Sequence, residues 1–384
     1  MKPLDGLRVV DLGIITAGAS TSALLADLGA EVIKVEGPSY IDPFRRWAGA
    51  AGVEDWWNAS PHFHFTNRNK KGLCVDLKSE SGRALLLDLV AVSDVVVENF
   101  SVGVLDRLGL GFDALRQANP RIVLGSVSSQ GVTGPDAGAV SFGSTLEASS
   151  GFADLVRYSA EEPPFISGQA LNYPDQVVSL IATGLIISTV IESRRTGLAR
   201  HVDISQREVT AFMLGEKVVE AVHGLVPDAG AGAPDLLQGV FPARDGQWIA
   251  VSVSSDAAAV RLCGRLGWDA LDAERLGAWI SGRDAAETLA CLESVGVSAS
   301  LARRVCDLPS LDTPEAVGPA FAIAPDGKPV KGLPWTIDGE AMKVRHTAPR
   351  LGEHNRNIVV DLLKRSEDTY HELVVQGVLA QAPA

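Results

Sequence analysis

The sequence predicts an α/β fold built on a doubly wound parallel sheet, because short apolar strands and helices alternate along its first third. A strand–helix–strand order of this kind produces parallel strands with helices on both faces of the sheet. The alternation stops after residue 203, where the composition changes. A chain of 384 residues also exceeds one compact core of the usual size, so two domains or one elaborated domain are expected.

Each early element has its own local signal. The segment 7–12 (LRVVDL) is a short apolar strand, and 18–29 is a helix with leucines at helical spacing. Residues 31–36 (EVIKVE) alternate with period two and carry β-branched side chains, as strands do. A helix over 79–92 begins with Ser79. The remaining strand-like segments are 73–78, 94–97 and 121–126.

The later part of the chain is organised differently. A Gly- and Ala-rich tract occupies 229–234, and 239–253 is expected to form a hairpin. Residues 256–300 are predicted to be helical, and 324–339 are rich in loops with three prolines. A helix from about 355 to 364 and a final helix complete the predicted elements.

Composition and charge restrict the function. The chain carries 34 Lys and Arg against 47 Asp and Glu, a formal net charge of −13, and 46% of its residues are hydrophobic. This is the composition of an ordinary soluble globular protein. The acidic balance argues against binding to nucleic acids or acidic membranes. An anionic ligand would therefore need a local cluster of Lys and Arg.

Cysteine usage and the apolar segments predict a cytoplasmic location. The four cysteines are scattered without metal-ligand spacing and are expected to be reduced thiols; they are Cys74, Cys263, Cys291 and Cys306. No signal peptide is visible. The most apolar stretch, 177–191, is shorter than the roughly 20 residues that span a bilayer, so we expect a buried core helix and no membrane contact.

Several motifs admit both a structural and a functional interpretation. The turn at 13–18 follows the first strand but lacks the GxGxxG pattern of a dinucleotide site, and no P-loop, GxSxG or HExxH motif occurs. The basic cluster at 67–72 is either a solvated turn or a cradle for phosphates. Asn99 and Phe100 follow a strand, at the edge where ligands of such sheets gather, although Asn is also a common turn former.

Asp175 stands at the start of the long apolar helix. An Asp at this position is most often an N-cap that satisfies a free backbone N–H. The alternative is that the helix N-terminus keeps the carboxylate ionised for nucleophilic attack. The seven histidines do not form a constellation, so no metal site is expected.

Together these segments resemble the class III CoA-transferase family, which includes formyl-CoA:oxalate and crotonobetainyl-CoA:carnitine CoA-transferases. The resemblance covers nearly the whole chain, and its motifs follow the family's order. They are LDGLRVVDL at 4–12, ADLGAEVIKVE at 26–36, NRNKK at 67–71, ENF at 98–100, DRLGL at 106–110, NPRIV at 119–123, GVTGP at 131–135, RTG at 195–197, VDIS at 202–205 and APRLGEHN at 348–355.

The resemblance implies that Asp175 is the catalytic nucleophile. The implied activity moves CoA from an acyl-CoA donor to a carboxylic acid through an aspartyl mixed anhydride and an aspartyl-CoA thioester. CoA is then a substrate, and no tightly bound cofactor or metal is expected. The residues implied in CoA binding are Thr16, Ala17, Val75, Asp76, Leu77, Lys78, Asn99, Phe100 and Arg107.

The charge balance adds an expectation for the phosphates of CoA. A positive surface is expected from Arg68, Lys70, Lys71 and Lys78 together with Arg107. Some relatives carry a further basic residue soon after the second strand. That residue is absent here, and Arg45 or Arg46 is expected to replace it.

The resemblance also implies an architecture. Residues 1–205, completed by 345–384, would form a large CoA-binding α/β domain, and 206–344 a smaller α+β domain with linkers. Two such subunits would interlock as a homodimer. The acyl and acceptor groups are expected near the loop at 141–144 and the tract at 229–234, which lies where relatives carry a glycine-rich flap.

Two other functions compete with the transferase. The family includes α-methylacyl-CoA racemases, which carry a His-Asp pair after the GP turn, where this chain has Phe142 and Gly143. A racemase or epimerase needs an acid/base on each face of the α-carbon, so the transferase is favoured. The alternative from another class is a non-catalytic module that binds CoA or a dinucleotide.

Overall fold

The computed structural model describes residues 2–47, 53–155, 163–167, 173–225, 236–304, 321–333 and 335–384. The chain divides into two compact units, unit 1 with Met1–Val218 and Gly318–Ala384, and unit 2 with Val219–Val317. These divisions differ from the boundaries expected from the sequence, after residues 205 and 344. The reason is that the segments just beyond those boundaries make their contacts within unit 1.

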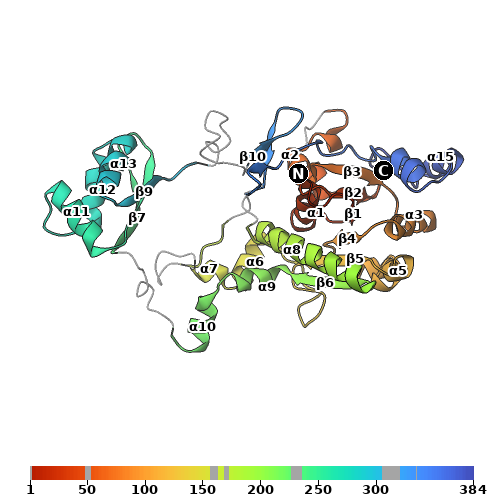
Figure 1. The fold of residues 1–384 in the computed structure, drawn as a ribbon, viewed down its shortest axis with the longest axis horizontal. Helices are drawn as coiled ribbons and strands as arrows, with labels where there is room; N and C mark the ends of the chain where they lie inside the picture. Colours follow the sequence, from red (N-terminus) through yellow and green to blue (C-terminus); the bar gives the residue numbers. More distant parts are fainter. Residues whose placement is uncertain are drawn as a thin grey trace. The chain divides into compact units, whose positions relative to one another are not determined.

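Unit 1 is built on a six-stranded sheet with the strand order β3-β2-β1-β4-β5-β6 (Figure 1). Every neighbouring pair of these strands is parallel. The order reverses between β1 and β4, and open α/β sheets bind ligands at the carboxyl ends of the strands that flank such a reversal. The strands are β1 (Arg8–Asp11), β2 (Glu31–Glu36), β3 (Lys70–Cys74), β4 (Val95–Glu98), β5 (Val123–Ser128) and β6 (Arg200–Ser205).

Helices cover both faces of this sheet, as the doubly wound prediction requires (Figure 1). Val9 and Val10 of β1 lie in different cores because successive side chains of a strand point to opposite faces. Val9 joins Leu25 and Ile186 in one buried cluster, and Val10 joins Leu86 and Leu373 in the other. The helices concerned are α1 (Ala17–Asp27) and α8 (Tyr173–Thr196) on the first face, and α3 (Glu80–Ala91), α5 (Phe112–Ala118) and α15 (Glu367–Val375) on the second.

Most early elements lie where the sequence places them. The helix predicted at 18–29 is α1, the strand at 31–36 is β2, and Ser79 caps α3 by accepting a hydrogen bond from the backbone of Gly82. The exception is β3, which was expected to begin at residue 73 and begins at Lys70. The basic cluster therefore enters the sheet instead of forming a turn before it.

Helix α8 is longer and less buried than expected. It spans 24 residues and is long and apolar enough to cross a membrane by length and composition alone, and 39% of its most apolar window is buried. One face, with Val178, Ala182 and Ile186, packs against α1 and β5. Other side chains of the helix, among them Leu185 and Ile191, are exposed. The prediction of a buried core helix is thus correct for one face only.

The rest of unit 1 consists of short elements. The loop-rich region predicted at 324–339 contains two small antiparallel hairpins, and the helix predicted near 355–364 is π-helical. These elements are η1 (Pro43–Arg46), η2 (Trp56–Asn58), α2 (Pro61–Asn67), α4 (Val104–Arg107), α6 (Gly143–Ser149), α7 (Phe152–Leu155), α9 (Gln206–Phe212), α10 (Glu216–Val222, at the division between the units), β10 (Phe321–Ile323), β11 (Pro329–Lys331), β12 (Thr336–Ile337), β13 (Glu340–Ala341) and η5 (Asn357–Leu362).

Unit 2 has its own core. Strands β7 and β8 form the hairpin predicted at 239–253, and β9 adds to it in an antiparallel sheet. Helix and strand side chains such as Ile249, Leu262 and Leu292 share one buried cluster. The tract at 229–234 and Cys306 lie outside the described residues. The elements are β7 (Leu237–Pro242), β8 (Trp248–Val253), α11 (Asp256–Leu266), α12 (Ala273–Ser281), α13 (Ala285–Ser294) and β9 (Ser298–Leu301).

Candidate active site

A cleft of about 940 Å³ lies in unit 1, at the carboxyl ends of the sheet strands. Its walls come from the residues that follow β1, β2, β4 and β5, so it includes the reversal of strand order between β1 and β4. This volume is near the upper end of the range of about 300–1,000 Å³ that is usual for small-molecule sites. Eight sequence-predicted site residues line it: Thr16, Asp76, Leu77, Lys78, Asn99, Phe100, Arg107 and Asp175.

Asp175 lies in the first turn of α8, with its carboxylate at the start of α1. The backbone N–H groups of Ala17 and of Asp175 itself lie close enough to the carboxylate to favour its ionised form. Ser179 ties the two helices together, because its hydroxyl donates to the carbonyls of Ala17 (3.1 Å) and Asp175 (2.6 Å). Burial raises the pKa of Asp175 to about 6, against the opposing effect of the two N–H groups. The site therefore holds a carboxylate that is desolvated but still ionised at neutral pH.

The backbone that leads into α1 forms a tight, strained turn at residues 13–15. Ile15 has a φ of +59°, a left-handed conformation that is unusual for a β-branched residue and costs about 1–3 kcal/mol. Asn99 clamps the residue before it, since its side-chain amide accepts from the Ile14 N–H (2.7 Å) and donates to the Ile14 carbonyl (3.0 Å). Gly13 and Gly18 touch across the turn, and a Cβ on Gly18 would lie 2.7 Å from the Gly13 Cα.

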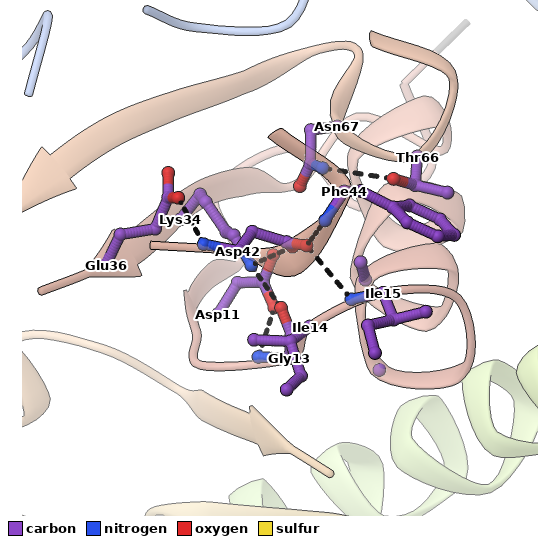
Figure 2. A network of polar contacts seen from close by, with 12 residues as sticks. Asp11, Gly13, Ile14, Ile15, Lys34, Glu36, Asp42, Phe44, Thr66 and Asn67 are labelled. Carbon is purple, nitrogen blue, oxygen red and sulfur yellow. Dashed lines mark hydrogen bonds and ion pairs between the residues drawn. The ribbon is translucent and has the colours of Figure 1, made fainter. Parts of the chain in front are cut away.

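Buried charged side chains contact the same turn from within the protein (Figure 2). The Asp42 carboxylate accepts hydrogen bonds from the backbone N–H groups of Ile15 (3.2 Å) and Phe44 (2.9 Å). Lys34 donates to Asp42 (3.0 Å) and to the carbonyl of Gly13. Burial disfavours the charge on Lys34, but the neighbouring carboxylates outweigh it and hold the pKa of Lys34 above its ordinary value. The turn at 13–15 is therefore fixed by side chains from several separate segments.

Two cations line the cleft. Lys78 and Arg107 are both exposed, and neither forms an ion pair with any residue of the described ranges. Phe100 lies between them in the sequence, and its backbone N–H donates to the Glu98 carboxylate (2.8 Å). Exposed Tyr40 and Trp47 add aromatic surface to the lining. An anionic ligand with an aromatic or apolar portion suits this combination.

Two of the predicted CoA contacts do not line the cleft. Val75 is fully buried, and its backbone N–H donates to the carbonyl of Glu36 (2.7 Å), so its side chain belongs to the core. Ala17 is also buried, and what it offers is its backbone N–H to Asp175. Ala17 thus lies beside the carboxylate of Asp175 and outside the wall that faces the cleft.

The expected basic surface is wrong for three of its five members. Arg68 and Lys70 are buried in ion pairs with Asp27 and Asp11, and Lys71 pairs with Glu31. The reason is the position of β3. Arg68 and Lys71 precede or begin the strand and pair with carboxylates away from the cleft lining, whereas the ammonium of Lys70 is buried behind the turn at 13–15, where it donates to Asp11.

The expected replacement for the missing basic residue is also corrected for Arg45. Its guanidinium is fully buried, pairs with Glu36 (2.8 Å) and stacks 3.6 Å above the ring centre of Phe63. Arg46 is exposed and lies over Trp56, outside the cleft lining. Neither arginine lines the cleft, and Arg45 instead neutralises a carboxylate in its wall.

Sequence reasoning missed several residues of the site. Lys34 and Asp42 were not singled out, although a Lys at an inward position of the strand EVIKVE is a signal of a buried, paired charge. The loop expected to hold the acyl group, 141–144, does line the cleft, with Ser128 and Gln206 beside it. Within the described ranges, no group of three or more His, Cys, Asp or Glu side chains is placed to hold a metal ion.

Comparison with known proteins decides the family. The chain matches the profile of CoA-transferase family III over residues 4–355. It belongs to this family. It is 29% identical to the succinyl-CoA–D-citramalate CoA-transferase of Chloroflexus aurantiacus, with 98% of each chain aligned. It is 30% identical to the succinate–glutarate CoA-transferase of Agrobacterium fabrum, with 94% of this chain and 96% of that relative aligned.

Two further similarities concern length and fold. A probable CoA-transferase of Mycobacterium tuberculosis is 34% identical over 82% of this chain, and the match spans 42% of that relative's length. The crystal structure of a CAIB/BAIF family protein from Brucella suis superimposes with a TM-score of 0.82 at 28% identity, covering 94% of this chain and 99% of that one. The family III membership and the parallel-sheet architecture therefore agree.

The raised pKa of Asp175 gives a pH prediction. A nucleophilic carboxylate must be ionised, so kcat/KM for the acyl-CoA donor should fall about tenfold per pH unit below an acid limb near pH 6. The measurement is the pH–rate profile from pH 4.5 to 8. An acid limb near 3.8, the ordinary value for Asp, would contradict the desolvated position of Asp175.

The correction of the basic surface gives a second prediction. Arg107→Ala should raise the KM for the acyl-CoA donor, because a lost charge-assisted hydrogen bond costs about 1–3 kcal/mol, or roughly 5- to 150-fold. Lys71→Ala is the matched control, since Lys71 pairs with Glu31 at the other edge of the sheet. If the two substitutions raised the donor KM equally, Lys71 would contribute to CoA binding as much as Arg107, and the correction of the basic surface would be wrong.

Proposed function

We propose that this protein is a class III CoA-transferase that moves CoA from an acyl-CoA donor to a carboxylic acid, with Asp175 as the nucleophile. The observation that carries the proposal is the carboxylate of Asp175, held in the wall of the cleft by the N–H of Ala17. Family membership supports the reaction class. The relatives named above are CoA-transferases that act between carboxylic acids, which supports the choice of acceptor.

The first half-reaction would begin with attack of an Asp175 oxygen on the thioester carbonyl of the donor. The carbon–sulfur bond breaks, CoA thiolate leaves, and a mixed anhydride joins the donor acyl group to Asp175. The thiolate then attacks the aspartyl carbonyl of that anhydride. An aspartyl-CoA thioester forms, and the donor acid leaves as its carboxylate.

The second half-reaction would retrace these steps with the acceptor. The acceptor carboxylate attacks the aspartyl-CoA thioester, which gives a new anhydride and releases CoA thiolate again. The thiolate attacks the acceptor's acyl carbon, so the acceptor leaves as its CoA thioester and Asp175 returns as a carboxylate. No net proton is consumed, and the energy of the thioester is kept without ATP.

The start of α1 would assist the two steps in which the aspartyl carbonyl is attacked. Negative charge develops on a carbonyl oxygen whenever a tetrahedral intermediate forms at the aspartyl carbon. The N–H groups of Ala17 and Asp175 lie beside the resting carboxylate and favour its negative charge, so they are placed to stabilise that oxyanion. The low exposure of the site strengthens the same interactions.

The phosphates and pantetheine of the donor would lie along the other end of the cleft. Lys78 and Arg107 supply its positive charge, and Phe100 supplies apolar contact. The acyl and acceptor groups would lie towards the loop 141–144, whose serines offer hydrogen bonds and whose Phe142 is exposed. A panel of acyl-CoA donors against carboxylic acids, followed by mass spectrometry, identifies the pair.

The racemase alternative receives no support from the cleft. Among its described lining residues there is no histidine, and Phe142 stands where racemases carry the first member of their acid/base pair. Solvent-deuterium incorporation at the α-carbon of an acyl-CoA, without an acceptor acid, would reopen that alternative. Binding of NAD in place of CoA in a titration would favour the dinucleotide-binding module instead.

The proposed enzyme would work as a homodimer of interlocked subunits. Support comes from the family and from apolar side chains left exposed on α8 and α9, among them Ile191 (65% exposed) and Phe212 (80% exposed). Exposed apolar surface of this kind usually marks an interface. Light scattering should give twice the chain mass of 40.4 kDa, and a monomer at micromolar concentration would contradict the dimer.

The nucleophile is tested by substitution. Asp175→Asn keeps the volume of the side chain but removes the attacking oxygen anion, so kcat should fall by about 10³-fold or more while CoA still binds. The measurement pairs steady-state transfer kinetics with calorimetric titration of CoA. Wild-type turnover in Asp175→Asn would refute the mechanism, and loss of CoA binding would show that the substitution had damaged the cleft itself.

A further inference from the structure

Six charged side chains are buried beneath the turn at residues 13–15. They form three ion pairs, Asp11 with Lys70 (2.8 Å), Lys34 with Asp42 (3.0 Å) and Glu36 with Arg45 (2.8 Å). None of the six is more than 5% exposed. Burying charges is unfavourable unless each is paired and fully hydrogen-bonded, and apolar residues could fill the same volume at less cost. Packing alone therefore does not explain why these six buried side chains are charged.

The ion pairs connect directly to the backbone of the turn. Asp11 accepts from the N–H of Gly13 (2.9 Å), Lys34 donates to the carbonyl of Gly13, and Asp42 accepts from the N–H of Ile15 (3.2 Å). Lys70 extends the connection to α1, since its ammonium donates to the carbonyl of Ala19 (2.8 Å). The left-handed Ile15 is thus held by contacts on both sides.

We propose that Lys34 and Asp42 are positioning residues whose ion pair holds the 13–15 turn so that the N–H of Ala17 meets the carboxylate of Asp175. The path is short, because only Thr16 separates the turn from Ala17. The proposal rests on the proposed function, in which that N–H acts on the reacting carboxylate. Lys34 is fully buried and outside the cleft lining, so it acts through the turn and not on substrate.

The chain offers a matched control pair at the other end of α1. Asp27 is buried, pairs with Arg68 and accepts a hydrogen bond from Asn69 (2.8 Å). It has no contact with the 13–15 turn among the described hydrogen bonds and ion pairs. Asp27→Asn therefore removes a buried negative charge from the same helix without touching the proposed positioning contact.

The experiment compares Asp42→Asn and Lys34→Met with Asp27→Asn. We expect kcat to fall at least about tenfold in the first two variants, with donor KM changed less than about threefold, because a misplaced donor weakens the transition state more than binding. Asp27→Asn should keep kcat within about twofold even if urea unfolding shows an equal loss of stability. Asp42→Asn keeps the volume of the side chain and one acceptor oxygen. It therefore tests the positioning role even if Lys34→Met does not fold.

The titration of Asp175 separates positioning from simple charge effects. Burial and the N–H groups of Ala17 and Asp175 govern its pKa, and no charged side chain in the described ranges contributes. Loss of the negative charge of Asp42 does not by itself raise the pKa of Asp175, because removing a negative charge can only favour ionisation of a carboxyl group. Loss of the Ala17 hydrogen bond raises it. Positioning therefore predicts that the Asp175 pKa rises above 6 in Asp42→Asn and is unchanged in Asp27→Asn.

The titration is read by ¹³C NMR of protein labelled at its aspartate carboxyl carbons, with Asp175→Asn to assign the signal. This measurement does not require turnover. If the wild-type protein lacked transferase activity, the proposed function would be refuted, but the effect of Asp42 on the pKa of Asp175 could still be measured. An unchanged or lowered Asp175 pKa in Asp42→Asn would overturn the positioning. So would a loss of kcat in Asp27→Asn equal to that in Asp42→Asn.

Discussion

The contact between the first N–H of α1 and the carboxylate of Asp175 is the interaction on which the active site depends. It joins two helices that pack side by side on one face of the sheet, with Ser179 bonded to the backbone of both. The direction of the nucleophile is therefore set by the packing of α1 on α8. Because α1 begins just after a strained turn, it is also set by whatever holds that turn.

The buried ion pairs serve the electrostatics of the cleft as well as its geometry. Glu36 and Asp42 are in the cleft lining, where free carboxylates would repel a polyanionic substrate. Arg45 and Lys34 neutralise them from within the protein. In a chain with a net charge of −13, this arrangement leaves Lys78 and Arg107 as the cations that face the cleft among its described lining residues.

The sheet was predictable because its signals are local. The period-two pattern of EVIKVE and the alternation of strands with helices do not depend on distant residues, and β2 begins and ends where they place it. Eight of the ten site residues that the family resemblance implied line the cleft, Asp175 among them, since its motifs end near strand termini. Without the resemblance, the local sequence does not distinguish a helix-capping role of Asp175 from a nucleophilic one. Both roles need an Asp at the start of a helix.

The basic cluster shows what local patterns cannot provide. Lys70 and Lys71 are adjacent basic residues, a pattern that is also found in phosphate-binding sites. Their actual partners depend on where β3 begins. A strand start three residues earlier than expected pairs Lys71 with Glu31 at the amino end of β2 and buries Lys70 against Asp11, behind the turn at 13–15. Lys34 was missed, and Arg45 was wrongly expected in the CoA site, for a related reason. Their partners, Glu36 and Asp42, become neighbours only when the chain after β2 folds back.

The most direct test of the central claim is intact-protein and peptide mass spectrometry after incubation with an acyl-CoA donor and no acceptor acid. The account predicts a covalent adduct with the mass of CoA as a thioester, on the peptide that contains Asp175, and none in Asp175→Asn. Removal by hydroxylamine would establish the thioester. A donor that is turned over by the wild type with no adduct at Asp175, or with the adduct on another residue, would contradict the account.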